Sequence, residues 1–197
     1  MRVLRPVFFL LLVMVVGFVA PLVAAEPVAE VFLTESVDSA PSIVAAGQGQ
    51  VIVAWSVLFG PTAPAVLTSQ RLDANLLTSE QRTIADDRGR PESLFFCPAA
   101  ASVGADRIAF AWLESTHGEQ RIAYRVTTKS GDSVSPIRYV EPVLRGREID
   151  CPRIGGGANS FVIAWSSKRS GRVPKISFRA RSFNASGAPL SEPLEME

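Results

Sequence analysis

Apolar and polar positions follow a pattern that recurs three times along the chain. The three segments read APSIVAAGQGQVIVAW at 40–55, CPAAASVGADRIAFAW at 97–112 and CPRIGGGANSFVIAW at 151–165. In each, a short apolar run after a proline is followed by a Gly, Asn or Asp turn and a β-branched and aromatic run ending in Ala-Trp. A period of about fifty residues is typical of an array built from one supersecondary unit. The anchors are Pro41, Pro98 and Pro152, and then Trp55, Trp112 and Trp165.

The run that ends in tryptophan predicts a strand with two unlike faces. Side chains alternate along a strand, so Ile108, Phe110 and Trp112 share one side and Ala111 lies on the other. Both faces are apolar, one bulky and one small, in all three copies. Such a strand is covered on both sides, so we expect sheets stacked face to face, with bulky residues of one over small residues of the next.

A third and a fourth run complete each unit. The third contains an apolar residue and an arginine, and these arginines are Arg71, Arg125 and Arg181. Repetition with the unit favours a role in the scaffold, in which a guanidinium bonds an adjacent unit or loop carbonyls. A catalytic arginine would instead break the repeat. The fourth runs are Ser79 to Ala85, Ser135 to Val140 and Ser191 to Glu197.

Four-stranded antiparallel units of this size, stacked by their faces, are the blades of a β-propeller. We expect an all-β chain with blades at residues 40–96, 97–150 and 151–197, preceded by an extra strand within 26–39. Closed propellers have about four to eight blades. Three blades form an incomplete propeller, so we expect a homo-oligomer, a partner chain that completes it, or a fragment of a longer ancestor. The extra strand is expected to add to the edge of another subunit.

Residues 1–25 have the features of a signal peptide. Arg2 and Arg5 are basic, the run from Val7 to Ala20 is apolar, and small residues precede Glu26. The alternative is a membrane anchor, but the apolar run is shorter than the roughly 20 residues that a spanning helix needs. We therefore expect an exported protein, periplasmic or extracellular, with no membrane span after cleavage.

Charge and cysteines limit the partners and the compartment. Without Arg2 and Arg5, 18 of the 20 basic residues remain against 19 acidic ones. This balance argues against non-specific electrostatic binding to nucleic acid or anionic lipid.

Cys97 and Cys151 each directly precede a repeat proline. They form either a disulfide between equivalent points of neighbouring units or two small buried thiols, and we favour the disulfide.

The repeat resembles the propeller units of bacterial secreted proteins, including the sialidase-like (BNR-type) superfamily. The matching pieces are the arginine-to-turn segments Arg71 to Asn75, Arg125 to Gly131 and Ser182 to Gly187. The Asp-box turn of sialidases, Ser-x-Asp-x-Gly-x-Thr-Trp, is absent. The resemblance implies an arginine cluster for a substrate carboxylate, a Tyr nucleophile activated by Glu, and an Asp acid. The residues of those types are Tyr124, Tyr139, Glu114 and Asp150.

Other catalytic signals are weak. His117 is the only histidine and lies in a hairpin, where a solvated loop residue is the simplest interpretation. The Gly155-Gly156-Gly157 run is interpreted as a hairpin turn, because no Lys-Ser/Thr follows it. The sequence predicts no metal site, no cofactor and no catalytic residue.

The function expected from these features is a secreted or periplasmic propeller-like module that binds a protein or carbohydrate ligand and is not an enzyme. The binding hairpins are expected at Leu58 to Pro64, Ser115 to Gln120 and Ser166 to Val173. The alternative is a divergent or truncated sialidase-type glycoside hydrolase. That enzyme would need Tyr and Glu within hydrogen-bond reach in a concave site lined by arginine.

Overall fold

The computed structural model describes residues 40–58, 65–73, 80–86, 93–141, 146–169 and 175–196. The predicted signal peptide and the extra strand within 26–39 lie outside these residues. In the described residues every regular element is a strand, as the sequence predicts. None of them forms a helix long and apolar enough to cross a membrane.

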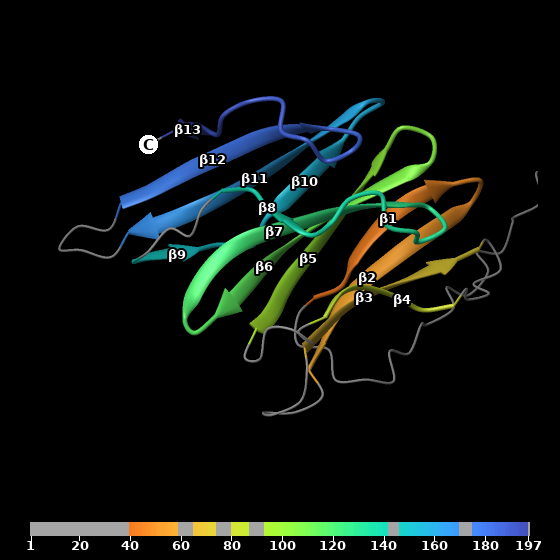
Figure 1. Cartoon of the computed structure of the whole chain (residues 1–197), viewed down its shortest axis with the longest axis horizontal. Coiled ribbons are helices and arrows are strands. Elements are labelled where there is room, and N and C mark those ends of the chain that lie inside the picture. Colours follow the sequence, from red (N-terminus) through yellow and green to blue (C-terminus); the bar gives the residue numbers. More distant parts are fainter. Residues whose placement is uncertain are drawn as a thin grey trace, which may run out of the picture. The chain divides into compact units, whose positions relative to one another are not determined.

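The strands form three antiparallel sheets, each a meander of consecutive hairpins (Figure 1). The first sheet contains β1 (Ser42–Gly47), β2 (Gln50–Leu58), β3 (Ala65–Leu72) and β4 (Arg82–Asp86). The second contains β5 (Ser93–Val103), β6 (Arg107–Thr116), β7 (Glu119–Thr128) and β8 (Arg138–Tyr139). The third contains β10 (Arg153–Gly156), β11 (Ser160–Arg169), β12 (Lys175–Asn184) and β13 (Leu194–Met196), and β9 (Arg147–Ile149) pairs with the far end of β11.

The first and second sheets pack face to face. The bulky side chains of Ile108, Phe110 and Trp112 on β6 lie in one buried cluster with the small Ala54 of β2. Trp112 has no exposed surface. Phe95 meets its indole edge to face, with ring centroids 6.4 Å apart, a favoured aromatic geometry. The bulky face of the second sheet therefore covers the small face of the first.

The second and third sheets repeat this arrangement. Phe161, Ile163 and Trp165 of β11 lie in a buried cluster with Ala109 and Ala111 of β6. The bulky face of the third sheet covers the small face of the second, so the stacking that the alternation predicts is confirmed at both contacts. Close packing of this kind requires large residues opposite small ones.

The first sheet differs, because no described sheet precedes it. Trp55, Val53 and Val57 of β2 form a separate buried cluster with Leu72 of β3, on the side away from the second sheet. Trp55 is 4% exposed, yet among the described residues its cluster draws on β2 and β3 alone. The expectation that every repeat tryptophan lies between two sheets is met by Trp112 and Trp165 but not, within the described chain, by Trp55.

The small face of the third sheet is open. Val162, Ile176, Phe178 and Leu194 are between 42% and 62% exposed. They lie on the face of the third sheet opposite Trp165. In the first and second sheets, the equivalent face is covered by the next sheet along the chain. The stack therefore presents an apolar face at this end.

Close approach between β5 and β10 depends on glycine. A Cβ on Gly156 would lie 1.9 Å from the carbonyl oxygen of Ser102, so any larger residue would force these strands apart. Gly104 has a φ of +63°, and its N–H donates to the carbonyl of Gly157 at 2.9 Å. The turns that the sequence predicts at these glycines thus also join the second and third sheets.

The repeat prolines are not equivalent in the strands. Pro41 and Pro152 directly precede β1 and β10, whereas Pro98 lies within β5. The β5–β6 pairing shifts register between Phe96 and Ala99. Proline has no N–H to donate, and a bulge is one of the few places inside a sheet where this costs no ladder hydrogen bond.

Cys97 and Cys151 form a disulfide, and their Cα atoms lie 5.4 Å apart. This confirms the disulfide and excludes the alternative of two free thiols. The bond joins a bulge of the second sheet to the segment before β10, across a sequence separation of 54 residues. Closing a loop of this length stabilises a fold by about 4 kcal/mol on the chain-entropy model.

Candidate functional site

The three repeat prolines meet beside the disulfide, where the first strands of the sheets begin. A pocket of about 250 Å³ is lined by Pro41, Pro98 and Pro152 together with the disulfide. Arg153 is the charged residue of this lining. A proton-transfer site needs an acid or base within reach of the substrate, and the described residues of this lining include no carboxylate and no imidazole.

Tyr139 and Glu114 come together as the hydrolase alternative requires. The Tyr139 hydroxyl lies 3.4 Å from both carboxylate oxygens of Glu114. Arg121 donates to Glu114 at 2.6 Å, and its guanidinium lies 3.8 Å from the centre of the Tyr139 ring. However, the Glu114 side chain is only 1% exposed. Glu114 and Arg121 therefore form a largely buried ion pair on the face of the second sheet that carries Trp112, and the Arg121 guanidinium stacks on the Tyr139 ring.

Tyr124 and Asp150, the other residues of the types named for a hydrolase, have structural partners. The Tyr124 hydroxyl donates to the carbonyl of Gly187 at 2.9 Å, and Arg138 donates to the same oxygen at 2.7 Å. Burial raises the pKa of Tyr124, which keeps the phenol protonated near neutral pH. Asp150 accepts from the N–H of Cys151 at 2.8 Å. Tyr124 nevertheless lines the same cavity as Tyr139 and Arg121, whereas Asp150 is not among the residues of that lining.

His117 lies in the turn between β6 and β7, where it has a φ of 52° beside Gly118. Its side chain is exposed. Among the described residues no three His, Cys, Asp or Glu side chains gather as a metal site.

Two of the repeated arginines tie each sheet to the one before it. Arg125 of β7 donates to the carbonyl of Ile84 on β4 at 2.6 Å. Arg181 of β12 donates to the carbonyl of Val140, which follows β8, at 2.5 Å. These equivalent charge-assisted hydrogen bonds cross from one sheet to the next, as expected for scaffold residues.

Arg71 departs from the repeat. Arg125 pairs with Phe110 and therefore lies on the bulky face of its sheet. In the first sheet the equivalent position, opposite Val53, is held by Gln70. Arg71 pairs with Ile52, one residue further on, and projects from the small face toward the second sheet. Arg71 is therefore not equivalent to Arg125. Arg71 lies three residues beyond Thr68, the partner of Trp55, whereas Arg125 lies two residues beyond Ala123, the partner of Trp112, so the two arginines project from opposite faces.

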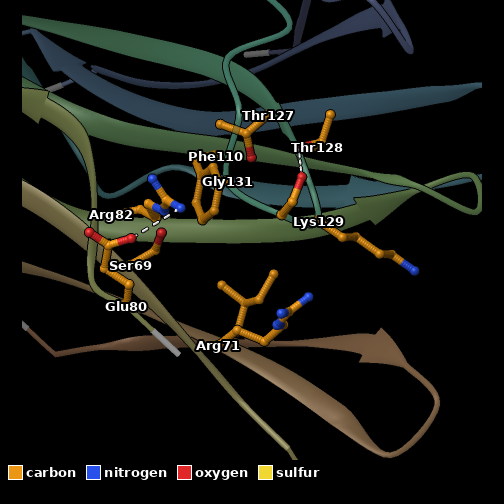
Figure 2. A pocket seen from close by; sticks show the side chains of 11 residues that line it. Ser69, Arg71, Glu80, Arg82, Phe110, Thr127, Thr128, Lys129 and Gly131 are labelled. Atoms are coloured by element: carbon orange, nitrogen blue, oxygen red, sulfur yellow. Dashed lines mark hydrogen bonds and ion pairs between the residues drawn. The ribbon is translucent and has the colours of Figure 1, made fainter. Parts of the chain in front are cut away.

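Arg71 lines a small pocket between the first and second sheets, shown in Figure 2. Arg82 of β4 and Lys129, in the turn after β7, line the same pocket. Its volume is about 80 Å³, and the largely buried Phe110 contributes to its wall. Glu80 is the carboxylate of the lining and lies 3.2 Å from Arg82. Among the described residues of the lining, three cations thus share a small space with one carboxylate.

The turn that carries Lys129 is held firmly. The N–H of Lys129 donates to the carbonyl of Asp106 at 2.8 Å. Gly131 has a φ of +96°, and a Cβ there would lie 2.8 Å from Cγ of Arg82. Ser130 donates to the carboxylate of Asp132 at 2.8 Å. The turn therefore packs directly against Arg82 and fixes one side of the pocket.

Sequence reasoning missed this pocket. Of its cations it named only Arg71, and it placed that residue in the scaffold. The predicted binding hairpins fall partly outside the described residues, since 59–64 and 170–173 are not described. A signal was present in the unequal spacing from tryptophan to arginine, which is 16 residues to Arg71 and 13 to Arg125.

No protein family and no curated protein sequence matches this chain. Several solved structures do. An α-L-arabinanase of Penicillium chrysogenum complexed with arabinobiose is 10% identical with a TM-score of 0.56, and the match covers 79% of this chain and 46% of that one. A GH93 α-L-arabinofuranosidase of Fusarium graminearum, also with arabinobiose, is 10% identical with a TM-score of 0.54, over 75% and 44%. The polysaccharide lyase Uly1 is 8% identical with a TM-score of 0.53, over 79% and 40%.

These similarities define the fold class. The arabinanase and the arabinofuranosidase are β-propeller glycoside hydrolases, so this chain has a propeller-like fold of a kind found in carbohydrate-active proteins. The chain spans less than half the length of the proteins it matches. At this level of identity the likeness concerns the fold alone.

Proposed function

We propose that this chain is a propeller-type module that binds carbohydrate without cleaving it. The fold likeness to carbohydrate-active propellers favours a glycan over a protein ligand. The observation that carries the proposal is the pocket of Arg71, Arg82 and Lys129, because it gathers hydrogen-bond donors at a gap between two rigid sheets. Sites built on strands hold donors more firmly than sites built on loops alone.

The burial of Glu114 supports binding without cleavage. A general acid or base must reach the bond that it protonates or the nucleophile that it activates. The Glu114 carboxylate is 1% exposed and bound to Arg121 at 2.6 Å. A buried carboxylate with a close guanidinium partner is held as an ion pair, and its place in the second sheet favours a structural role.

The second candidate is a sialidase-type glycoside hydrolase. The contact of the Tyr139 hydroxyl with both oxygens of Glu114, at 3.4 Å, favours it. In that enzyme Glu114 would draw the proton from Tyr139, and the phenolate would attack the sugar. Tyr139 and Arg121 line a cavity of about 710 Å³ together with Tyr124, Arg138 and Arg181. Glu114 itself is only 1% exposed, so this candidate requires the proton to pass from Tyr139 to a buried carboxylate.

We also propose that the protein is exported. The Cys97–Cys151 disulfide fits an oxidising compartment, such as the periplasm or the cell exterior. The basic and apolar start of the sequence supports the same proposal.

The test combines binding and turnover on the disulfide-bonded protein. Isothermal titration against a panel of oligosaccharides is expected to detect binding, and fluorogenic sialoside and arabinofuranoside substrates are expected to stay intact. Turnover that Tyr139→Phe abolishes would replace this proposal with the hydrolase. Absence of binding to every glycan, with no turnover, would refute both.

A further inference from the structure

We propose that the open face of the third sheet binds a second copy of this chain, in a symmetric contact whose twofold axis runs along β12. This interface goes beyond the proposed function, and glycan binding does not depend on it. An exposed apolar patch commonly marks an interaction surface. The exposed apolar residues of this face are Val162, Ile176, Phe178, Leu194 and Met196.

Phe178 occupies a position that is interior in the other sheets. Leu67 and Ile122 hold the same place on the third strands of the first and second sheets, one residue before the partner of the repeat tryptophan. They are 0% and 2% exposed, because the next sheet covers them, whereas Phe178 is 58% exposed. Phe178 is therefore an apolar side chain at a position built to be covered, and no described sheet covers it.

The tryptophan faces of the sheets are already buried. Trp112 and Trp165 pack against the preceding sheet, and Trp55 is 4% exposed. Among the described residues, a second copy therefore offers no open tryptophan face that would continue the stack. The apolar surface that it does offer is the same open face of its own third sheet, so the contact is symmetric.

This face is self-complementary about β12. Ala164 on β11, Ala180 on β12 and Leu194 on β13 form one row across the sheet, because Ala180 pairs with both of its neighbours. The row has a small residue at its β11 end and a large one at its β13 end. A half-turn about β12 exchanges the two ends, so Leu194 of each copy lies over Ala164 of the other. Large residues then meet small ones, as between the sheets of one copy.

The adjacent row has the same order. Ser166 on β11 and Met196 on β13 both pair with Phe178 on β12. The same half-turn places Met196 of each copy over Ser166 of the other. Phe178 lies on the axis, where its ring meets that of the other copy beside the small Ala180. The same order in both rows favours a second copy of this chain over an unrelated partner.

The charged residues beside these rows remain at the border of the contact. Arg153 pairs with Ala164 from β10, which lies two strands away from β12. The half-turn therefore places Arg153 beyond β13 of the other copy, where its guanidinium stays in water. Lys168 pairs with Glu148 of β9, so these opposite charges are neighbours within one copy. An apolar centre with a polar rim is the usual composition of a protein interface.

An exchange of the residues at positions 164 and 194 tests this arrangement. Within one copy Ala164 and Leu194 lie two strand spacings apart, about 10 Å, so coupling between them requires contact across copies. Sedimentation velocity over a range of concentrations gives the dissociation constant of the wild-type pair. Ala164→Leu fills the small position and Leu194→Ala removes the large one, and each is expected to weaken association about tenfold or more. The double variant restores a large residue over a small one and is expected to associate within about threefold of the wild type.

Ala158→Leu makes the same change at an exposed turn residue outside the face. It is the matched control and is expected to associate as the wild type does. Circular dichroism of each variant shows whether it is folded.

Three results would overturn the inference. The first is a single-copy mass for the wild type at every concentration, and the second is a paired species that neither single variant weakens. The third is a double variant that associates no more tightly than the single variants, because Leu194 and Ala164 would then not face each other across the contact.

Discussion

Arg71 and Arg125 lie on the third strands of adjacent sheets but project from opposite faces. Arg125, opposite Phe110, donates to Ile84 of the preceding sheet at 2.6 Å. Arg71, opposite Ile52, faces the pocket. We therefore predict that Arg125→Gln lowers the free energy of unfolding by about 1–3 kcal/mol, because a charge-assisted bond is lost and a carbonyl loses its partner.

Arg169→Gln, at an exposed arginine of the third sheet, is the contrasting change in that experiment. It is expected to cost about 0.5 kcal/mol or less, as for surface substitutions away from structural features. Urea unfolding of both variants makes the comparison. A loss for Arg125→Gln no larger than that for Arg169→Gln would contradict the role of Arg125 between the sheets.

Of the tryptophans between described sheets, Trp112 is predicted to lower the free energy of unfolding most when it is replaced by alanine. It is fully buried between the first and second sheets and contacts Phe95. Trp112→Ala is expected to cost about 3–5 kcal/mol in denaturant unfolding, as for large core residues replaced by alanine. Val162→Ala, on the open face of the third sheet, is the control. A loss below about 1 kcal/mol for Trp112→Ala would contradict the stacking.

The sheets and their faces could be predicted from the sequence because they depend on local alternation. The period-two pattern around Trp112 and Ala111 specified which side was bulky, and packing density required bulky residues to meet small ones. The same reasoning fails at Trp55, because alternation shows that a face must be covered but not what covers it.

The candidate site could not be predicted because it depends on the exact pairing of the third strand with the second. A shift of one residue along a strand moves a side chain to the other face of a sheet, and the spacing from tryptophan to arginine does not by itself give the pairing. Arg71 was therefore matched to Arg125 by residue type although the pairing matches Gln70. Lys129 and Gly131 line the pocket from the turn after β7, and turn residues show no hydrophobic periodicity in the sequence.

Stability at low pH is predicted to depend on Glu195. A hydrogen bond from Arg179, at 2.6 Å, lowers the pKa of Glu195 below its ordinary value of 4.5. A group whose folded pKa is lowered stabilises the fold above its unfolded pKa and loses that contribution as the pH falls through the folded pKa. Wild type is thus expected to be more stable than Glu195→Gln at pH 6, and the difference is expected to vanish well below pH 4.5.

Urea unfolding of wild type and variant across this pH range measures the difference directly. Glu192→Gln is the control, since Glu192 is 94% exposed and lies 4.0 Å from Arg181. It is expected to match the wild type at each pH. A stability difference for Glu195→Gln that stays constant down to pH 3 would contradict the assigned cause.

The open face of the third sheet is predicted to associate with a second copy. Phe178 and Leu194 are 58% and 62% exposed on a face whose counterparts in the other sheets are covered by bulky residues. Two copies that dock through this same face would each cover the exposed apolar residues of the other in a closed, symmetric contact. Sedimentation velocity is expected to give twice the chain mass for wild type.

Phe178→Lys is expected to shift this mass toward a single copy, because it places a charge in the apolar contact. Asn159→Lys, in an exposed turn outside that face, is expected to leave the mass of two copies unchanged. A folded single-copy species at all concentrations of the wild type would refute the association.

The location of glycan binding is tested most directly by titrating isotope-labelled protein with the oligosaccharide that binds best, followed by backbone amide resonances. The account predicts that the largest shifts fall on Arg71, Arg82 and the turn from Lys129 to Gly131. Shifts confined to the disulfide end, around Cys97 and Cys151, would contradict it.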